Sequence, residues 1–249
     1  MELRHPPAKG CAVTKTFDDI WPIADQAEGW CSDGQARALW RLTEAIEAPG
    51  TVVEIGSYQA RSLIVIAAAA ADGVGVVAID PHGGNDRGPQ QWTGTAEEGN
   101  EDNERFWANL SAAGLADRVT HIRSRSQAAH DDVGDVDFLY IDGAHGFSSA
   151  RDDLVRWGAK VADGGTMAVH DCFSSVGVTL ALLTTTFVSG RWRYVGRERS
   201  LAWFERVELG AAERITNALR QAASLPWFAQ NLVRKGLIAA KISKADWPY

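Results

Sequence analysis

Two apolar segments that each lead into ionisable side chains constrain the fold of this chain more than any other feature. Residues 136–141 and residues 166–169 are both apolar runs followed within four residues by a carboxylate and an imidazole. The four side chains are Asp142, His145, His170 and Asp171. Such runs are typical of parallel strands, which are buried on both faces. Ligands bind outside the carboxyl ends of strands in open α/β sheets, so the sequence predicts a site there. Carboxylates and imidazoles at one edge can hold a divalent cation or perform acid–base chemistry.

Strand-like and helix-like patterns alternate from residue 51 to residue 169, which predicts an α/β fold with a doubly wound, mostly parallel sheet and helices on both faces. The expected parallel strands are 51–55, 75–79, 119–122, 136–141 and 166–169. The expected helices among and after them are 61–71, 101–113, 149–161 and 176–187. Two more strands, 191–195 and 201–205, are expected to form a terminal antiparallel hairpin around the turn at 196–197. The prediction is therefore a seven-stranded, Rossmann-like sheet.

The chain divides by pattern into three parts. Residues 1–31 are interrupted by prolines and predict an N-terminal arm with one short helix. Residues 32–206 hold the alternating strands and helices and form the principal domain. Residues 207–249 predict a C-terminal helical extension, interrupted at Pro226. Residues 83–99 are polar and rich in glycine, and they predict either a solvated loop or a lid over the site.

Composition excludes several classes of partner. The net charge of −7 over 249 residues offers no basic field for nucleic acid or for anionic membranes. No apolar run is long enough for a transmembrane helix, and the N-terminus lacks the apolar core of a signal peptide. The three cysteines, Cys11, Cys31 and Cys172, are odd in number and far apart in sequence. This usage favours a reduced, cytoplasmic protein.

The end of the first strand predicts a compact ligand without a pyrophosphate group. Gly56 stands alone where a dinucleotide fingerprint needs three spaced glycines, and no phosphate-binding Gly-Lys-Ser/Thr follows. Glu54 lies within an apolar strand, where burial without a partner is costly. A cationic group of a ligand or the N–H groups of the turn would satisfy it. Asp80, which follows the second strand, can accept both hydroxyls of a ribose.

The order of these acidic strand ends resembles the class I S-adenosylmethionine-dependent methyltransferases over residues 32–206. The pattern is Glu54-x-Gly56, then Arg61-Ser62, then Asp80, and then Asp142. The resemblance implies S-adenosylmethionine as the cofactor, with its methionine end beside Glu54 and Gly56, its ribose on Asp80 and its adenine edge near Ser126 and Gln127. The implied cofactor-binding residues are Glu54, Gly56, Ser62, Asp80, Ser126, Gln127 and Asp142.

Within that superfamily, Asp142-x-x-His145 with His170-Asp171 is similar to metal-dependent small-molecule O-methyltransferases, including actinobacterial enzymes that methylate sugars. The similarity implies a Mg²⁺ site at Asp142, His170 and Asp171, a general base at His145, and a saccharide acceptor such as a mannoside. The chain departs from the pattern at His170, where a carboxylate is usual. Imidazole is a poorer ligand for Mg²⁺ than carboxylate, so His170 is either a ligand or a group that contacts a ligand or the substrate.

Three other functions stay open at this point. One is a catechol-type or other natural-product O-methyltransferase. Another is an iron enzyme that uses His145, His170 and Asp171 as a two-histidine, one-carboxylate triad. The third is a binding protein that retains the fold without catalysis. The apolar, tryptophan-containing stretch 225–237 also predicts a surface for a homodimer.

Overall fold

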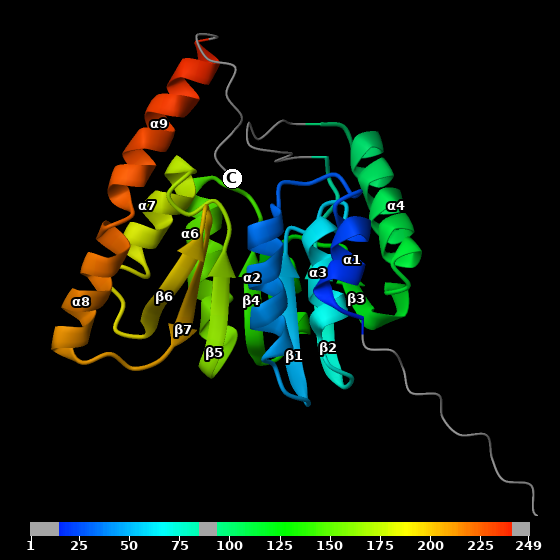
Figure 1. Ribbon diagram of the computed structural model, residues 1–249, viewed down its shortest axis with the longest axis horizontal. Helices are drawn as coiled ribbons and strands as arrows, with labels where there is room; N and C mark the ends of the chain where they lie inside the picture. Colours follow the sequence, from blue (N-terminus) through cyan, green and yellow to red (C-terminus); the bar gives the residue numbers. More distant parts are fainter. Residues whose placement is uncertain (1–14, 85–93, 241–249) are drawn as a thin grey trace, which may run out of the picture.

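The computed structural model describes residues 15–84 and 94–240, which surround one seven-stranded sheet (Figure 1). The strands are β1 (Gly50–Ile55), β2 (Val74–Ile79), β3 (Val119–Ile122), β4 (Val136–Ile141), β5 (Val161–Val169), β6 (Trp192–Glu198) and β7 (Leu201–Arg206). Their order across the sheet is β3-β2-β1-β4-β5-β7-β6. The first five strands run parallel, and β7 pairs antiparallel with both β5 and β6. The prediction of a doubly wound, mostly parallel sheet with a terminal antiparallel hairpin is confirmed.

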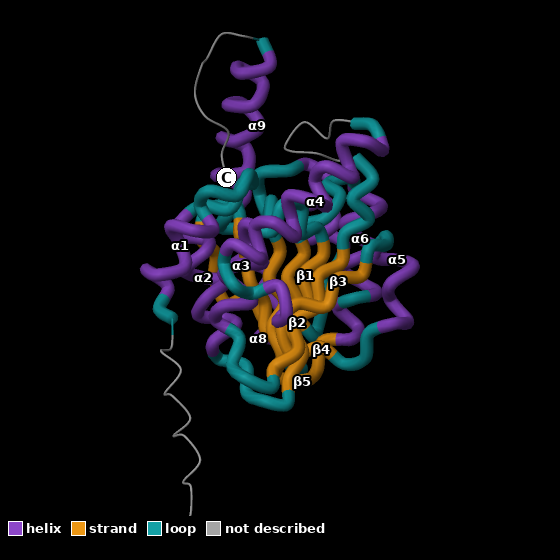
Figure 2. Tube along the Cα trace, turned by 90° about the vertical axis from the view of Figure 1, so that its right-hand side faces the viewer, coloured by secondary structure: helices purple, strands orange, loops and turns teal. Residues whose placement is uncertain are grey.

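Helices cover both faces of the sheet, as the view in Figure 2 shows. They are α1 (Phe17–Ala24), α2 (Asp33–Glu44), α3 (Arg61–Ala69), α4 (Ala96–Ala112), α5 (Ser126–Ala129), α6 (Phe147–Arg156), α7 (Val176–Thr184), α8 (Ala211–Ala222) and α9 (Leu225–Ala239). Helices α1 to α4 pack on one face, and α5, α6, α7 and the start of α9 pack on the other. None of these helices combines the length and the hydrophobicity that crossing a bilayer requires.

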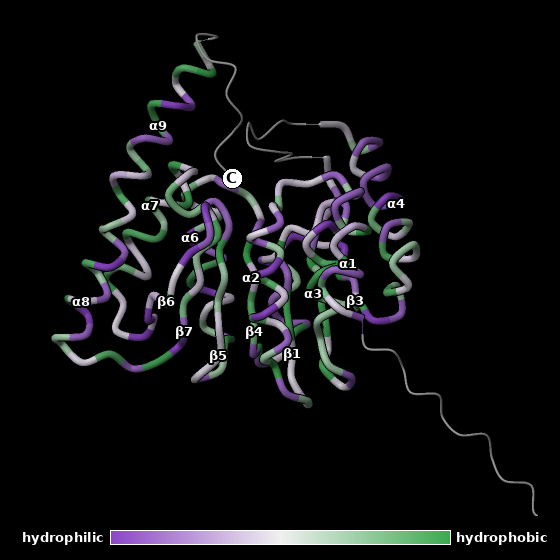
Figure 3. Tube along the Cα trace, in the orientation of Figure 1, coloured by the Kyte–Doolittle hydropathy of each residue, from purple (hydrophilic) through white to green (hydrophobic). Residues whose placement is uncertain are grey.

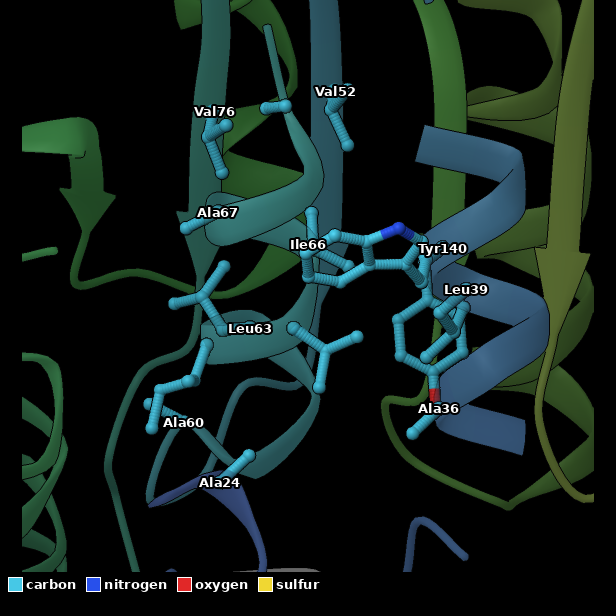
Figure 4. Close-up of a cluster of buried hydrophobic side chains, with 14 of the residues drawn as sticks. Ala24, Ala36, Leu39, Val52, Ala60, Leu63, Ile66, Ala67, Val76 and Tyr140 are labelled. Carbon is cyan, nitrogen blue, oxygen red and sulfur yellow. The ribbon is translucent and has the colours of Figure 1, made fainter. Parts of the chain in front are cut away.

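Alternate residues of the central strands face opposite cores, which explains why these strands are apolar throughout. Val52 and Tyr140 join the core beneath α2 and α3, where they meet Leu39 and Ile66 (Figure 4). Their neighbours along the strands, such as Val53, belong to the core beneath α6 and α7. In Figure 3, α9 alternates between hydrophobic and hydrophilic residues.

The register of the central strands places their carboxyl ends level with one another. Ile55 of β1 pairs with Ile79 of β2 and with Ile141 of β4, and Ile141 pairs with Val169 of β5. The residues that follow these four positions therefore share one edge of the sheet. They are Gly56, Asp80, Asp142 and His170.

Several predicted boundaries are wrong for local reasons. Helix α4 begins at Ala96 rather than 101, because Thr95 and Glu98 form a capping box. This also shortens the predicted 83–99 loop, of which residues 85–93 lie outside the described part of the chain. Helix α6 starts at Phe147 and ends at Arg156, and β5 then begins at Val161 instead of 166.

The C-terminal elements also differ from the prediction. The turn between β6 and β7 lies at Arg199, whose φ is +52°, because Gly196 is part of β6 at a register shift. The interruption of the C-terminal helical region lies at Ser224, just before Pro226. Pro226 stands in the first turn of α9, where a missing N–H removes no helical hydrogen bond.

Candidate active site

A cavity of about 620 Å³ opens at the carboxyl edge of β1, β2, β4 and β5. Its volume is within the range of small-molecule sites. Most residues predicted from the sequence line it: Gly56, Asp80, Ser126, Gln127, Asp142, His145, His170 and Asp171. Glu54 and Ser62 do not line it, so the structure does not bring these two to the cavity with the others.

Glu54 is fully buried beneath the edge and pairs with Ser62. The Ser62 hydroxyl donates a hydrogen bond to Oε1 of Glu54, and Oε2 has no hydrogen-bond partner among the described residues. Burial, with a further contribution from the charge of Asp142, raises the pKa of Glu54 to about 8. The Glu54 side chain is therefore mostly neutral at pH 7. Its partner is a hydroxyl, where the sequence suggested a ligand cation or the N–H groups of the turn.

Gly56 is required by a close approach between two strand ends. Its φ is +87°, and a Cβ there would lie 2.3 Å from the carbonyl oxygen of Asp142. The Asp142 N–H donates to the carbonyl of Ile55 at 2.8 Å. A side chain at position 56 would therefore push the Asp142 loop away from β1.

Asp80 is held in one orientation by the backbone around it. Its Oδ2 accepts from the N–H of Tyr58 at 2.9 Å, and its Oδ1 accepts from the N–H of His82 at 2.7 Å. A carboxylate oxygen can accept a second hydrogen bond, so both oxygens keep the capacity to bind ligand hydroxyls. Asp80 thus serves as a turn residue and remains available to the cavity.

Asp153 is a residue of the cavity that the sequence reasoning missed. The Ser126 hydroxyl donates to its Oδ1 at 2.6 Å, and Asp153 is only 3% exposed. Burial raises its pKa to about 6. In α6, Asp153 lies on the same buried face as Ala150 and Leu154, so its side chain turns inward. Its spacing from the inward-facing Ala150 and Trp157 was the available signal.

Four ionisable side chains meet at the ends of β4 and β5. Nδ1 of His170 lies 3.1 Å from Oδ1 of Asp142 and 3.6 Å from Oδ2 of Asp171. Nε2 of His145 lies 2.9 Å from the same Oδ2 of Asp171. The expectation that these four residues gather at one edge agrees with the structure.

The charges in this cluster shift one another's protonation. Burial opposes a charge on His170, but Asp142 and Asp171 outweigh it and raise the pKa of His170 to about 10. Burial likewise opposes a charge on His145, and Asp171 reverses the effect and raises the pKa of His145. Burial acts against ionisation of Asp171, yet the two imidazoles hold its pKa well below the ordinary value. The free site therefore carries paired positive and negative charges.

The turn that carries Asp171 is held from the outside by α9. Asp171 and Phe173 both have left-handed backbones, with φ of +57° and +58°. The side-chain amide of Asn231 donates to the carbonyl of Phe173 at 3.0 Å, and Nζ of Lys235 donates to the carbonyl of Ser174 at 2.8 Å. A strained turn persists only when its surroundings hold it, so α9 contributes to the position of Asp171.

An aromatic pair forms another wall of the cavity. Trp30 stacks on Tyr58 with ring centroids 5.5 Å apart, and both residues are half-buried. Arg61 holds the segment that carries Trp30: its guanidinium donates to the carbonyls of Cys31 and Ala27, each at 2.9 Å. The structure therefore places Trp30 beside the cavity.

The residues predicted to bind a metal fit a cation by their chemistry. Asp142, His170 and Asp171 each offer one ligand atom, and these atoms lie within 4.8 Å of one another. His170 is 3% exposed, and neither ring nitrogen has a hydrogen-bond partner of good geometry among the described residues. His145 is not part of this group, so the structure does not assemble the iron triad of His145, His170 and Asp171.

Part of the chain is similar to a known protein family. Residues 53–172, from β1 to the turn after β5, match the family model described as a methyltransferase domain. This stretch, a little under half of the chain, is similar to that family. The prediction that this protein is a methyltransferase enzyme is thereby confirmed, and the matched segment includes Gly56, Asp80, His145 and Asp171.

Solved structures share the fold of this methyltransferase. The O-methyltransferase TomG from Streptomyces achromogenes, in complex with SAM, is 15% identical with a TM-score of 0.55, over 80% of this chain and 93% of TomG. An O-methyltransferase from Bacillus cereus, in complex with SAH, is 13% identical with a TM-score of 0.56, over 78% of this chain and 94% of its own. The O-methyltransferase NovP is 17% identical with a TM-score of 0.54, over 70% of this chain and 80% of NovP.

Proposed function

We propose that this protein is an S-adenosylmethionine-dependent O-methyltransferase that acts on a hydroxyl group of a saccharide, with a divalent cation at Asp142, His170 and Asp171. The observation that carries the proposal is that two sets of predicted residues line one cavity of a methyltransferase domain. One set, with Asp80, is suited to a nucleoside, and the other, with His145, is suited to proton transfer.

Support for the cofactor comes from the fold and from the polar groups of the cavity. TomG and the Bacillus cereus enzyme, which share the fold, were solved with SAM and SAH respectively. In this chain, Asp80 has carboxylate oxygens for two ribose hydroxyls. Ser126 and Gln127 line the end of the cavity next to Asp153, and this end has polar groups for an adenine edge.

His145 is suited to the role of general base. Methyl transfer is an in-line displacement, so the acceptor oxygen must be placed at the methyl group and lose its proton. In its neutral form the imidazole of His145 can take that proton, and the carboxylate of Asp171, 2.9 Å away, orients the ring and stabilises the charged form that results. A divalent cation bound beside it would lower the pKa of the acceptor hydroxyl.

The saccharide acceptor is supported by the sequence resemblance and by the aromatic wall. Half-buried Trp30, stacked on Tyr58, offers a flat apolar surface next to carboxylates. A sugar ring can pack its apolar face on such a surface while its hydroxyls bind the carboxylates. A second candidate acceptor is a natural product with an aromatic hydroxyl. It is favoured by the similarity to TomG, which is involved in tomaymycin synthesis.

The proposal is tested by calorimetric titration of metal-stripped protein with S-adenosylhomocysteine. We expect binding that weakens at least about 10-fold in Asp80→Ala, because the ribose contacts are lost. Asp117→Ala, an exposed carboxylate in the turn before β3, is the matched control and should bind as the unsubstituted protein does. Absence of binding to the unsubstituted protein would overturn the proposal. Acceptors are then screened with mannosides against catechols, and turnover of catechols alone would replace the saccharide by the second candidate.

A further inference from the structure

We propose that His170 sets the cation preference of this site, so that the site binds divalent transition cations such as Co²⁺ and Mn²⁺ in preference to Mg²⁺. The inference rests on the proposed function and deepens it, because it concerns the cation of the same cavity. It follows from the donor atoms that the structure gathers: one imidazole nitrogen and two carboxylate oxygens.

The His170 ring is built into the donor group. It is 3% exposed, and its Nδ1 points between the two carboxylates, 3.1 Å from Asp142 and 3.6 Å from Asp171. Neither ring nitrogen makes a hydrogen bond of good geometry with the residues described here, and Nδ1 is held by the charges of the two carboxylates. A cation bound through Nδ1 would take the place of the proton on that nitrogen, between the same two carboxylates.

The two carboxylates each have one oxygen already engaged. Oδ2 of Asp142 accepts from the hydroxyl of Tyr140 at 3.0 Å, and Oδ1 of Asp171 accepts from the hydroxyl of Ser174 at 2.6 Å. Each carboxylate turns its other oxygen towards His170, and Oδ2 of Asp171 also contacts Nε2 of His145 at 2.9 Å. The protein supplies a small mixed set of donors, and the nitrogen is a substantial part of it.

Mixed nitrogen and oxygen donors discriminate between cations by their chemistry. Mg²⁺ prefers oxygen ligands throughout and tolerates imidazole poorly, whereas Mn²⁺, Fe²⁺, Co²⁺ and Zn²⁺ accept imidazole. A carboxylate at position 170 would make the site all-oxygen. His170 is therefore a specificity-determining ligand, and the side chain at this one position decides between the two classes of cation.

The test is a pair of calorimetric titrations of the metal-stripped, full-length protein, with Co²⁺ and with Mg²⁺. Any site binds the two ions with different affinities. The measured quantity is therefore the ratio of the Mg²⁺ dissociation constant to the Co²⁺ dissociation constant. We expect this ratio to fall at least about 10-fold in His170→Asp. The control is His130→Asp, a histidine at the α5 end that contacts Asp131 and Trp157, and the ratio should not change there. An unchanged ratio in a folded His170→Asp protein would overturn the inference.

A second measurement uses the unsubstituted protein and does not depend on how well the variant folds. Pulsed electron paramagnetic resonance of bound Mn²⁺ should show coupling to the ¹⁴N nucleus of a coordinated imidazole. Bound Mn²⁺ without such coupling, or no binding of Mn²⁺ and Co²⁺ at all, would contradict the role of His170. Titration of the same preparation with S-adenosylhomocysteine separates the two proposals. If the protein binds S-adenosylhomocysteine but lacks the cation preference, only the inference is wrong. If it shows the cation preference but does not bind S-adenosylhomocysteine, only the proposed methyltransferase function is wrong.

Discussion

His145 shows how one neighbouring side chain defines the chemistry of a residue. Its Nε2 lies 2.9 Å from Asp171, in a buried pair, and this contact raises the pKa of the imidazole. A histidine on the surface of the protein would have no fixed orientation and no such stabilisation of its charged form. The pair is therefore the structural reason for assigning the base to His145.

We expect His145→Gln to lower kcat by about 10²- to 10⁴-fold, because the proton acceptor is lost while a side chain of similar size remains. Binding of S-adenosylhomocysteine, measured by calorimetry, should stay unchanged, since cofactor contacts are assigned to other residues. His130→Gln is the control and should retain full turnover. Turnover of His145→Gln equal to that of the unsubstituted protein would assign the base elsewhere.

The buried carboxyl group of Asp153 makes the stability of the protein depend on pH. Burial raises its pKa from the ordinary value of 3.8 to about 6, so the folded state favours the protonated form. The protein therefore loses stability as the pH rises from about 4 to about 6, by about 3 kcal/mol when Asp153 is fully ionised. Asp153→Asn keeps an oxygen for the Ser126 hydroxyl and removes this loss. Urea unfolding at pH 4 and pH 7 should show a gain in relative stability for the variant at pH 7 only. An equal difference at both pH values would contradict the shifted pKa.

Helix α7 determines where the His145 loop lies, through a single glycine. A Cβ at Gly177 would stand 2.1 Å from the carbonyl oxygen of His145 and 2.7 Å from the N–H of Phe147. The helix and the loop can make this contact only without a side chain at position 177. The position of the proposed base thus depends on the packing of a helix more than thirty residues later in the chain.

We expect Gly177→Ala to destabilise the protein by about 1–3 kcal/mol through overpacking and to reduce kcat, because the His145 loop must move. Gly236→Ala is the matched control: it is also a helical glycine, and a Cβ there meets nothing within 4 Å. The control should be neutral or more stable by up to about 1 kcal/mol, since alanine favours helix. Thermal unfolding and turnover of both variants give the comparison, and a neutral Gly177→Ala would show that α7 does not hold the loop.

A second prediction concerns the contact between helix α9 and the turn that follows Asp171. Asn231, which is buried, donates to the carbonyl of Phe173 in the strained turn after Asp171. Asn231→Ala leaves that carbonyl unpartnered and should cost about 1–3 kcal/mol of stability. Hydrogen exchange should become faster in residues 170–175, and exposed Gln230→Ala should leave it unchanged. Unaltered exchange in Asn231→Ala would mean that the turn keeps its shape without α9.

For the molecule as a whole, we predict a homodimer that uses the outer faces of α8 and α9. The first residues of α9, such as Phe228, pack on the core, whereas Val233 is 64% exposed and Ile215 of α8 is 65% exposed. In Figure 1, α9 extends beyond the edge of the sheet. Exposed apolar residues on neighbouring helices are typical of association surfaces.

Light scattering after size-exclusion chromatography should give the mass of a dimer for the unsubstituted protein. Val233→Glu places a charge in the proposed surface and should shift the mass towards that of a monomer. Val195→Glu, on an exposed position of β6, is the control and should remain dimeric. A monomeric mass at every concentration would remove the dimer from the description of this protein.

The sequence by itself determined the sheet and the edge at which the site lies. Both depend on local patterns: apolar strands of short length, helices of regular period, and ionisable residues directly after Ile79, Ile141 and Val169. Parallel strands in register bring such positions together without any further information. The gathering of Asp80, Asp142 and Asp171 around one cavity was therefore predictable.

Only the tertiary structure decided how individual side chains are used. Glu54 pairs with Ser62 beneath the cavity, Asp153 turns into it, and Trp30 reaches it from the N-terminal segment held by Arg61. These outcomes depend on contacts between different elements of the fold. Periodicity indicates which face of an element is buried, as the spacing of Asp153 from Ala150 does, but it does not show which groups meet there.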